Sequence, residues 1–363
     1  MRALLIGGSG FIGPHVARAL DRLGHEVVIF HRGTGRAHGS APTRRGSGAA
    51  PRVGSGAGAD PRVGAHQIIG DRRKLEDSAA ELRALRPDVV VDLILSSGTQ
   101  ARALMQIFRG AAPRVVALSS CDVYRACGVL HGSEPGPLQP LPLTESSDLR
   151  TNLQTYPPDR VKMLQQVFGW LDEEYDKIPV EREILGDRDL PGTVLRLPMV
   201  YGPGDPLHRL FPVLKRMDDR RPAILFEEKH AAWRAPRGYV ENVAAAIGLA
   251  ATNDRAARRI YNVGDARCLS ELEYAHHVAA ETGWSGDFAV LPADRTPAHL
   301  RWPGNLDQHW VTDTTRIREE LGYREPIERG EAIRRTIEWE RANPPAVDPR
   351  AFDYAAEDAV IST

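Results

Sequence analysis

The stretch GGSGFIG at residues 7–13 decides the fold, because it stands between a short apolar run and a helical pattern. Residues 2–6 form the apolar run, and apolar side chains recur at helical spacing over residues 12–23. Glycines let the backbone turn sharply and approach a phosphate, whose charge is favoured at a helix N-terminus. The G-x-x-G-x-x-G spacing between a strand and a helix therefore predicts a dinucleotide-binding loop.

Apolar β-rich runs alternate with helical patterns through the first part of the chain. We expect strands at residues 2–6, 26–30, 66–70, 88–95, 114–120 and 193–200. These runs are continuously apolar, which is typical of a parallel sheet covered on both faces. The pattern predicts an α/β fold with a Rossmann-type doubly wound parallel sheet and a smaller C-terminal α/β substrate lobe.

The domain boundaries follow from a change of pattern after residue 200. We expect residues 1–200 to form the dinucleotide-binding domain, and residues 237–265 to rejoin it with one more helix and strand. Residues 201–236 and 266–363 are then the substrate lobe.

Two stretches interrupt the strand–helix rhythm. Residues 33–65 are rich in Gly, Ala and Arg and hold a degenerate repeat. Such a segment buries too little apolar surface to offset the entropy lost on ordering, so we expect a disordered surface insertion. A basic arm that touches RNA is the alternative for this segment. Residues 125–154 are rich in Pro, Gly and Ser and predict a loop over the ligand cleft.

Composition excludes several classes of function. Lys and Arg number 47 against 48 Asp and Glu, so the net charge is −1. This balance does not indicate a basic surface for nucleic acid or a polybasic patch for a membrane. The three cysteines have no metal-ligand spacing and favour a reducing compartment. The N-terminus is too short and too glycine-broken for a signal peptide, and no apolar run is long enough to span a membrane. We expect a cytoplasmic protein without a metal.

The end of the second strand bears on the choice of cofactor. The usual nucleotide fingerprint has an acid there, which holds the ribose 2′-hydroxyl, but this chain reads IFHRG and places Arg32 after His31. An arginine suits a 2′-phosphate, so the cofactor is expected to be NADP or NAD, with NADP slightly favoured.

Several further motifs carry a resemblance to a known family. They are GGSGFIG (7–13), GD (70–71), SSCDVY (119–124), LRLPMVYGPGD (195–205), RGYVENVAAAI (237–247) and YNVGD (261–265). With these motifs the chain resembles the extended (atypical) short-chain dehydrogenase/reductase family, also called NAD-dependent epimerase/dehydratase. The resemblance covers nearly the whole chain apart from the two interruptions, and it is specific for the superfamily but not for a substrate.

The resemblance implies hydride transfer between a nicotinamide and a substrate carbon. In such enzymes a tyrosine is the acid/base, a lysine four residues later lowers the pKa of that tyrosine and holds the ribose, and a serine orients the substrate. Ser120 matches the family's serine and Lys177 its lysine. The expected cofactor-binding residues are Gly7, Gly10, Phe11, Ile12, Gly13, His31, Arg32, Asp71, Arg72, Leu95, Lys177, Pro198 and Val200.

The acid/base is the open point, because the position four before Lys177 is Glu173 and not tyrosine. Tyr175 is our first candidate, but two residues of a regular helix that are two apart point to opposite sides. It therefore needs a helix that begins near residue 175. Tyr156, Glu173 and the loss of tyrosine-type chemistry are the alternatives.

The sequence favours an NAD(P)-dependent epimerase/dehydratase or reductase that acts on a nucleotide-sugar-like or other carbonyl or hydroxyl substrate. The alternative is a catalytically inactive NAD(P)-binding protein of the same fold with a regulatory or RNA-binding role. The expected partner is a small-molecule substrate, neither nucleic acid nor a membrane is expected, and a homodimer stays an option.

Overall fold

A seven-stranded parallel sheet forms the centre of the computed structural model, which describes residues 1–33 and 66–361. Its strand order is β10-β6-β5-β4-β1-β2-β3, so the chain runs outward from β1 in both directions. The strands are β1 (Arg2–Ile6), β2 (Glu26–His31), β3 (His66–Ile69), β4 (Val89–Asp92), β5 (Val115–Ser120), β6 (Gly192–Leu197) and β10 (Ile260–Asn262). This order confirms the predicted Rossmann-type doubly wound sheet.

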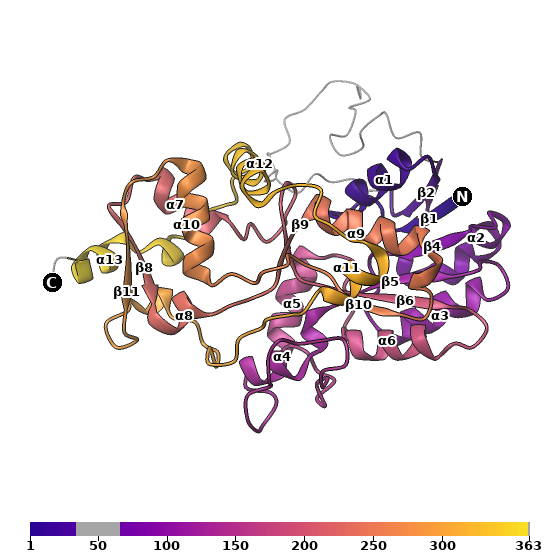
Figure 1. Cartoon of the computed structure of the whole chain (residues 1–363), viewed down its shortest axis with the longest axis horizontal. Helices are drawn as coiled ribbons and strands as arrows, with labels where there is room; N and C mark the ends of the chain where they lie inside the picture. Colours follow the sequence, from indigo (N-terminus) through magenta and orange to yellow (C-terminus); the bar gives the residue numbers. More distant parts are fainter. Residues whose placement is uncertain (34–65, 362–363) are drawn as a thin grey trace, which may run out of the picture.

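Helices cover both faces of this sheet (Figure 1). The helices α1 (Gly13–Arg22) and α9 (Val240–Thr252) pack together on one face, and α3 (Gly98–Phe108) and α6 (Lys177–Gly186) pack together on the other. Side chains of β1 alternate between two buried clusters, with Leu5 on the α1–α9 side and Leu4 on the opposite side. The continuous apolar strands are thus explained by burial on both faces.

Shorter elements surround this core. The segment after β3 forms a 3₁₀-helix, η1, followed by α2. The bounds are η1 (Arg72–Ser78), α2 (Ala79–Ala84), η2 (Cys121–Val123), α4 (Arg125–Leu130), α5 (Pro158–Val167), η3 (Asp254–Ala256) and α11 (Thr315–Leu321).

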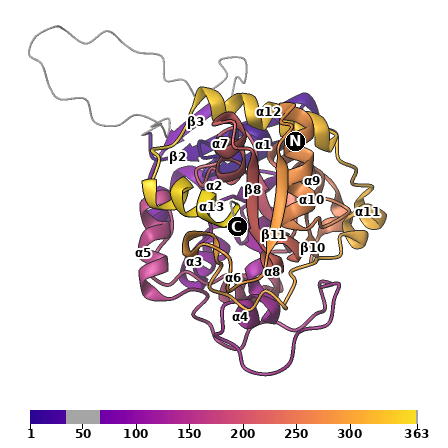
Figure 2. The same cartoon turned by 90° about the vertical axis from the view of Figure 1, so that its left-hand side faces the viewer.

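A smaller lobe lies beside the sheet domain, and Figure 2 looks onto it. Two parallel strands, β8 and β11, form its sheet, while β7 pairs with β9 where the chain passes between the two parts. The bounds are β7 (Met199–Tyr201), α7 (Phe211–Asp218), β8 (Ala223–Glu227), α8 (Glu228–Ala232), β9 (Arg237–Tyr239), α10 (Glu271–Thr282), β11 (Asp287–Leu291), η4 (Ala298–Leu300), α12 (Arg329–Ala342), η5 (Pro349–Phe352) and α13 (Tyr354–Ile361). None of the helices in the described ranges is long and apolar enough to cross a membrane.

Some sequence-based boundaries differ from the structure. The expected strand at 193–200 is two strands, because Pro198 lies between β6 and β7 and has no N–H for a sheet ladder. The expected strand at 88–95 ends at Asp92. The expected loop at 125–154 begins with α4, and α11 lies beside β10 although residues 266–363 were assigned to the lobe. The predicted insertion at 33–65 lies, apart from Gly33, outside the described residues.

Candidate active site

The glycine loop, residues 7–13, connects β1 directly to the N-terminus of α1. Gly7 has a φ of +84°, which favours glycine, and its N–H donates to the carbonyl of Phe30 at 2.9 Å. A Cβ on Gly13 would lie 2.3 Å from the carbonyl oxygen of Gly8, so the helix can start here only with a glycine. Gly10 is exposed, and the backbone there is open to a ligand. The loop therefore fits the pyrophosphate of a dinucleotide at a helix N-terminus.

Gly10→Val is expected to weaken dinucleotide binding about ten- to a hundredfold, the scale of one hydrogen bond to a charged group, without loss of thermal stability. A Cβ at Gly10 meets no atom nearer than the carbonyl oxygen of Gly7 at 3.6 Å, so the fold accepts the side chain while a pyrophosphate does not. Titration with NAD and NADP, together with a melting curve, measures both effects. Gly186→Val is the control, because Gly186 is exposed and a Cβ there meets nothing within 4 Å. Equal affinities for wild type and Gly10→Val would remove the loop from the cofactor site.

The residues expected at the adenosine end have different environments. Arg32 is exposed at the end of β2 and donates to the carbonyl of Gly169 at 3.2 Å, and His31 Nε2 lies 3.0 Å from an oxygen of Gln67. Asp71 is at the start of η1, where it accepts from the backbone N–H of Arg73 at 3.0 Å. Hydrogen bonding to Arg73 lowers the pKa of this carboxyl.

The side chain of Arg72, another expected cofactor residue, is directed into the protein. Its Nε donates to Asp92 at 2.7 Å and its Nη2 donates to the carbonyl of Gln100 at 3.0 Å, and the residue is 4% exposed. The guanidinium therefore ties η1 to β4 and α3, which leaves the backbone of Arg72 for any contact with a cofactor.

The other expected cofactor residues surround the carboxyl edge of the sheet. Phe11 lies next to Gly204, where a Cβ would be 3.3 Å from its ring, and Ile12 is the N-cap of α1. Pro198 and Val200 are buried at the passage from β6 to β7. The carbonyl of Leu95, just after β4, accepts a hydrogen bond from Lys177.

Lys177 is the first residue of α6, and Asp176 caps this helix by accepting from the N–H of Ile178 at 2.7 Å. The ammonium is buried between the ends of two central strands, where it donates to the carbonyls of Leu95 and, at 3.2 Å, Leu118. Burial lowers the pKa of Lys177 to about 8, against the opposing effect of nearby carboxylates. A lysine in this place can hold a ribose and supply positive charge.

Tyr175 lies before the N-cap, so the condition for its role as acid/base is met: the helix begins at Lys177. Its hydroxyl donates to Asp122 Oδ2 at 2.9 Å, and the ammonium of Lys177 is 5.7 Å from its ring centre. The hydroxyl of Tyr156 reaches the same oxygen at 3.4 Å, and the two phenol rings stack with centres 6.2 Å apart. Burial, followed by the charge of Asp122, raises the pKa of both tyrosines.

Asp122 is the functional candidate that sequence reasoning missed. It is 1% exposed, burial raises its pKa, and its Oδ1 is buried without a hydrogen-bond partner in the described part of the chain. Ser120 is the last residue of β5, and its Oγ accepts from the N–H of Asp122 at 3.3 Å. The available signal was an acid two residues after Ser120, at the carboxyl end of a central strand.

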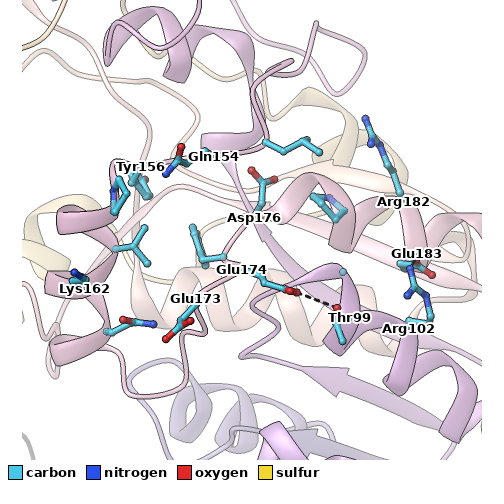
Figure 3. Close-up of a pocket in the computed structure, with 17 residues that line it drawn as sticks. Thr99, Arg102, Gln154, Tyr156, Lys162, Glu173, Glu174, Asp176, Arg182 and Glu183 are labelled. Carbon is cyan, nitrogen blue, oxygen red and sulfur yellow. Dashed lines mark hydrogen bonds and ion pairs between the residues drawn. The ribbon is translucent and has the colours of Figure 1, made fainter.

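Glu173, the remaining acid/base alternative, is exposed. It lines a pocket of about 840 Å³ together with Tyr156 and Tyr175, and Figure 3 shows this pocket. Glu173 makes no hydrogen bond to Asp122 or Lys177 among the described contacts, so it stands apart from the buried Tyr175–Asp122–Lys177 group.

Arg237 in β9 is a second residue that the sequence did not single out as functional. Its Nη2 pairs with Glu271 at 2.6 Å, and its guanidinium lies 4.2 Å from the ring centre of Tyr274. Its Nη1 is buried and has no hydrogen-bond partner within the described ranges. A buried cationic N–H without a partner is free to donate to an acceptor oxygen of a ligand.

Comparisons with known proteins show the family and the fold of the chain. The model of the NAD dependent epimerase/dehydratase family matches residues 3–264. No curated protein matches the chain significantly.

Solved structures of similar fold cover almost the whole chain. The UDP-glucose 4-epimerase of Thermotoga maritima, solved with UDP-glucose, is 18% identical with a TM-score of 0.59, covering 94% of this chain and 99% of that chain. The dTDP-glucose 4,6-dehydratase of Bacillus anthracis in complex with NAD is 14% identical with a TM-score of 0.62, covering 96% and 99%. The UDP-glucose 4-epimerase of Thermus thermophilus in complex with NAD is 19% identical with a TM-score of 0.57, covering 94% and 99%. At these identities the likeness establishes the fold.

Proposed function

Since the chain belongs to the NAD-dependent epimerase/dehydratase family, we propose that it is an NAD(P)-dependent epimerase/dehydratase or reductase acting on a nucleotide-sugar-like substrate. The observation that carries this proposal is the grouping of Ser120, Asp122, Tyr175 and Lys177 at the carboxyl edge of the sheet. Ligands of doubly wound folds bind at this edge.

The proposed chemistry assigns a task to each of these side chains. A bound nicotinamide supplies a place for the hydride that leaves or joins the substrate carbon. When a hydroxyl is oxidised, Tyr175 accepts the substrate proton while its own phenolic proton passes to Asp122 Oδ2, 2.9 Å away. In the reverse direction Tyr175 donates its proton to a carbonyl oxygen and regains one from Asp122. The raised pKa of Tyr175 keeps the phenol protonated before this step. Ser120 orients the substrate oxygen, and Lys177 holds the ribose.

The substrate class rests on the unpartnered Nη1 of Arg237. A diphosphate offers the acceptor oxygens that a buried guanidinium N–H requires, and one relative of similar fold was solved with UDP-glucose. For the cofactor we propose NAD or NADP, with NADP slightly favoured because Arg32 is exposed where a 2′-phosphate would lie.

Arg237→Ala is expected to raise KM for a nucleotide sugar about ten- to a hundredfold, the scale of a charge-assisted hydrogen bond. Turnover of a panel of nucleotide sugars, measured with wild type and variant, gives this number. Arg234→Ala is the matched control, since Arg234 is a partly exposed neighbour that pairs with Glu273. An unchanged KM for Arg237→Ala, or turnover limited to substrates without phosphate, would contradict the proposed substrate class.

A catalytically inactive NAD(P)-binding protein is the second candidate, favoured by Glu173 at the position of the family tyrosine. It predicts dinucleotide binding without turnover of any member of the panel.

A further inference from the structure

The segment 168–175, which we name the strap, crosses the carboxyl edge of the sheet between α5 and α6. It meets three neighbours along this path: Gly169 accepts from Arg32 at the end of β2, Asp172 contacts the start of α3, and Tyr175 reaches Asp122 after β5. The strap therefore runs above the edge at which the dinucleotide is proposed to bind.

The two halves of the strap are held with different strength. The carboxylate of Asp172 accepts hydrogen bonds from Ser96 at 3.0 Å, Ser97 at 2.8 Å and Gln100 at 2.9 Å, which fixes the middle of the strap to the β4–α3 turn. The first half is held at Gly169 by the exposed guanidinium of Arg32 at 3.2 Å. Replacing such an exposed hydrogen bond by one to water or to a ligand costs little free energy.

The ring of Trp170 occupies the space in front of the ammonium of Lys177. The Nζ atom is 5.4 Å from the centre of the indole, within the range of a cation–π contact. Two of its three N–H groups face the carbonyls of Leu95 and Leu118, so one N–H remains on the side of the rings of Trp170 and Tyr175. A ribose hydroxyl has to approach this N–H to about 2.7–3.2 Å. On the side of Trp170 it would then lie between Nζ and the indole, whose centre is only 5.4 Å from Nζ, so the two do not fit together.

Two of the proposed cofactor ligands, Arg32 and Lys177, are thus engaged by consecutive residues of one segment, Gly169 and Trp170. We propose that Trp170 and Gly169 form an autoinhibitory contact that covers the dinucleotide groove and is displaced when the cofactor binds. This inference rests on the proposed cofactor role of Lys177. The first half of the strap moves, while the Asp172 anchor stays and keeps Tyr175 beside Asp122.

Trp170→Ala is expected to tighten NAD(P) binding about three- to tenfold, because the cation–π contact that competes with the ribose is gone. The NAD(P) affinity of Trp170→Phe, which keeps a smaller ring, should lie between those of Trp170→Ala and wild type. Calorimetric titration measures the affinities. Stopped-flow mixing should show an observed binding rate that saturates with cofactor concentration in wild type and stays linear in Trp170→Ala, since the opening step has been removed.

Trp339→Ala is the control, because Trp339 is also half-buried but stacks on His208 in the lobe region. It should leave the cofactor affinity unchanged. Weaker or equal binding by Trp170→Ala, with wild type binding normally, would overturn the autoinhibitory contact and leave the proposed function standing. If neither wild type nor Trp170→Ala binds NAD or NADP, the cofactor proposal fails and this inference fails with it.

Discussion

Lys177→Ala is expected to reduce turnover at least about a hundredfold and to weaken dinucleotide binding about ten- to a hundredfold. The substitution removes the ammonium that donates to the carbonyl of Leu95, just after β4, and to that of Leu118 in β5. It also leaves the buried carbonyls of Leu95 and Leu118 without this donor, so a lower melting temperature is expected as well. Titration and kinetics at a temperature well below melting separate the two effects.

The pH dependence gives Lys177 a signature that a merely structural residue lacks. Its pKa of about 8 in the folded chain is below the usual value, so the ammonium is present below that pH and is lost above it. We expect kcat/KM to fall as the pH rises through about 8, and Lys177→Arg to shift that fall to higher pH. Lys229→Ala is the control, because this lysine is exposed on α8, where it pairs with Asp307, and the variant should keep wild-type activity. Full activity of Lys177→Ala would exclude the lysine from the mechanism.

Tyr175→Phe is expected to lower kcat by about a hundredfold or more, the usual scale for a proton-transfer group, with cofactor affinity unchanged. Asp122→Asn should have a similar effect, because it removes the acceptor of the phenolic proton. Tyr156→Phe is the matched control: its hydroxyl meets the same Asp122 oxygen, but at 3.4 Å and not 2.9 Å. Steady-state kinetics of the three variants gives the ranking.

Two outcomes would change the assignment of the acid/base. A larger loss in Tyr156→Phe than in Tyr175→Phe would move the role to Tyr156. If both phenylalanine variants keep full activity and Glu173→Gln does not, the proton passes through Glu173.

The fold around the proposed cofactor site could be predicted from sequence because its signals are local. The glycine spacing, the flanking apolar runs and the arginine after the second strand all lie in one stretch of about thirty residues, and parallel-sheet topology then fixes their common edge. The start of α6 was also readable, since Asp176 is a good N-cap and Pro179 suits a first turn.

The catalytic half could not be predicted because it depends on contacts between distant residues. Tyr175 meets Asp122 across 53 positions of sequence, and a search for a tyrosine four residues before a lysine does not find this contact. The role of Arg237 appears only when its buried Nη1 is seen to lack a partner in the described chain. Trp170 lies seven residues before Lys177, and nothing in their spacing shows that the strap folds back over the ammonium.

Hydride transfer at this site is the central claim, and isotope transfer tests it most directly. The protein is incubated with nicotinamide cofactor and a panel of nucleotide sugars, in which the cofactor is reduced and deuterated at C4 or the sugar carries deuterium at its carbinol carbons. Mass spectrometry then follows deuterium between the two. The account predicts isotope transfer, or conversion to an epimer or a dehydrated product, with at least one nucleotide sugar, and a strong loss of that reaction in Tyr175→Phe. An epimerase or dehydratase returns the hydride to the same sugar without net exchange, so formation of an epimer or a dehydrated product is measured as well. Tight cofactor binding with neither isotope transfer nor conversion of any member of the panel would contradict the account and favour the inactive binding protein.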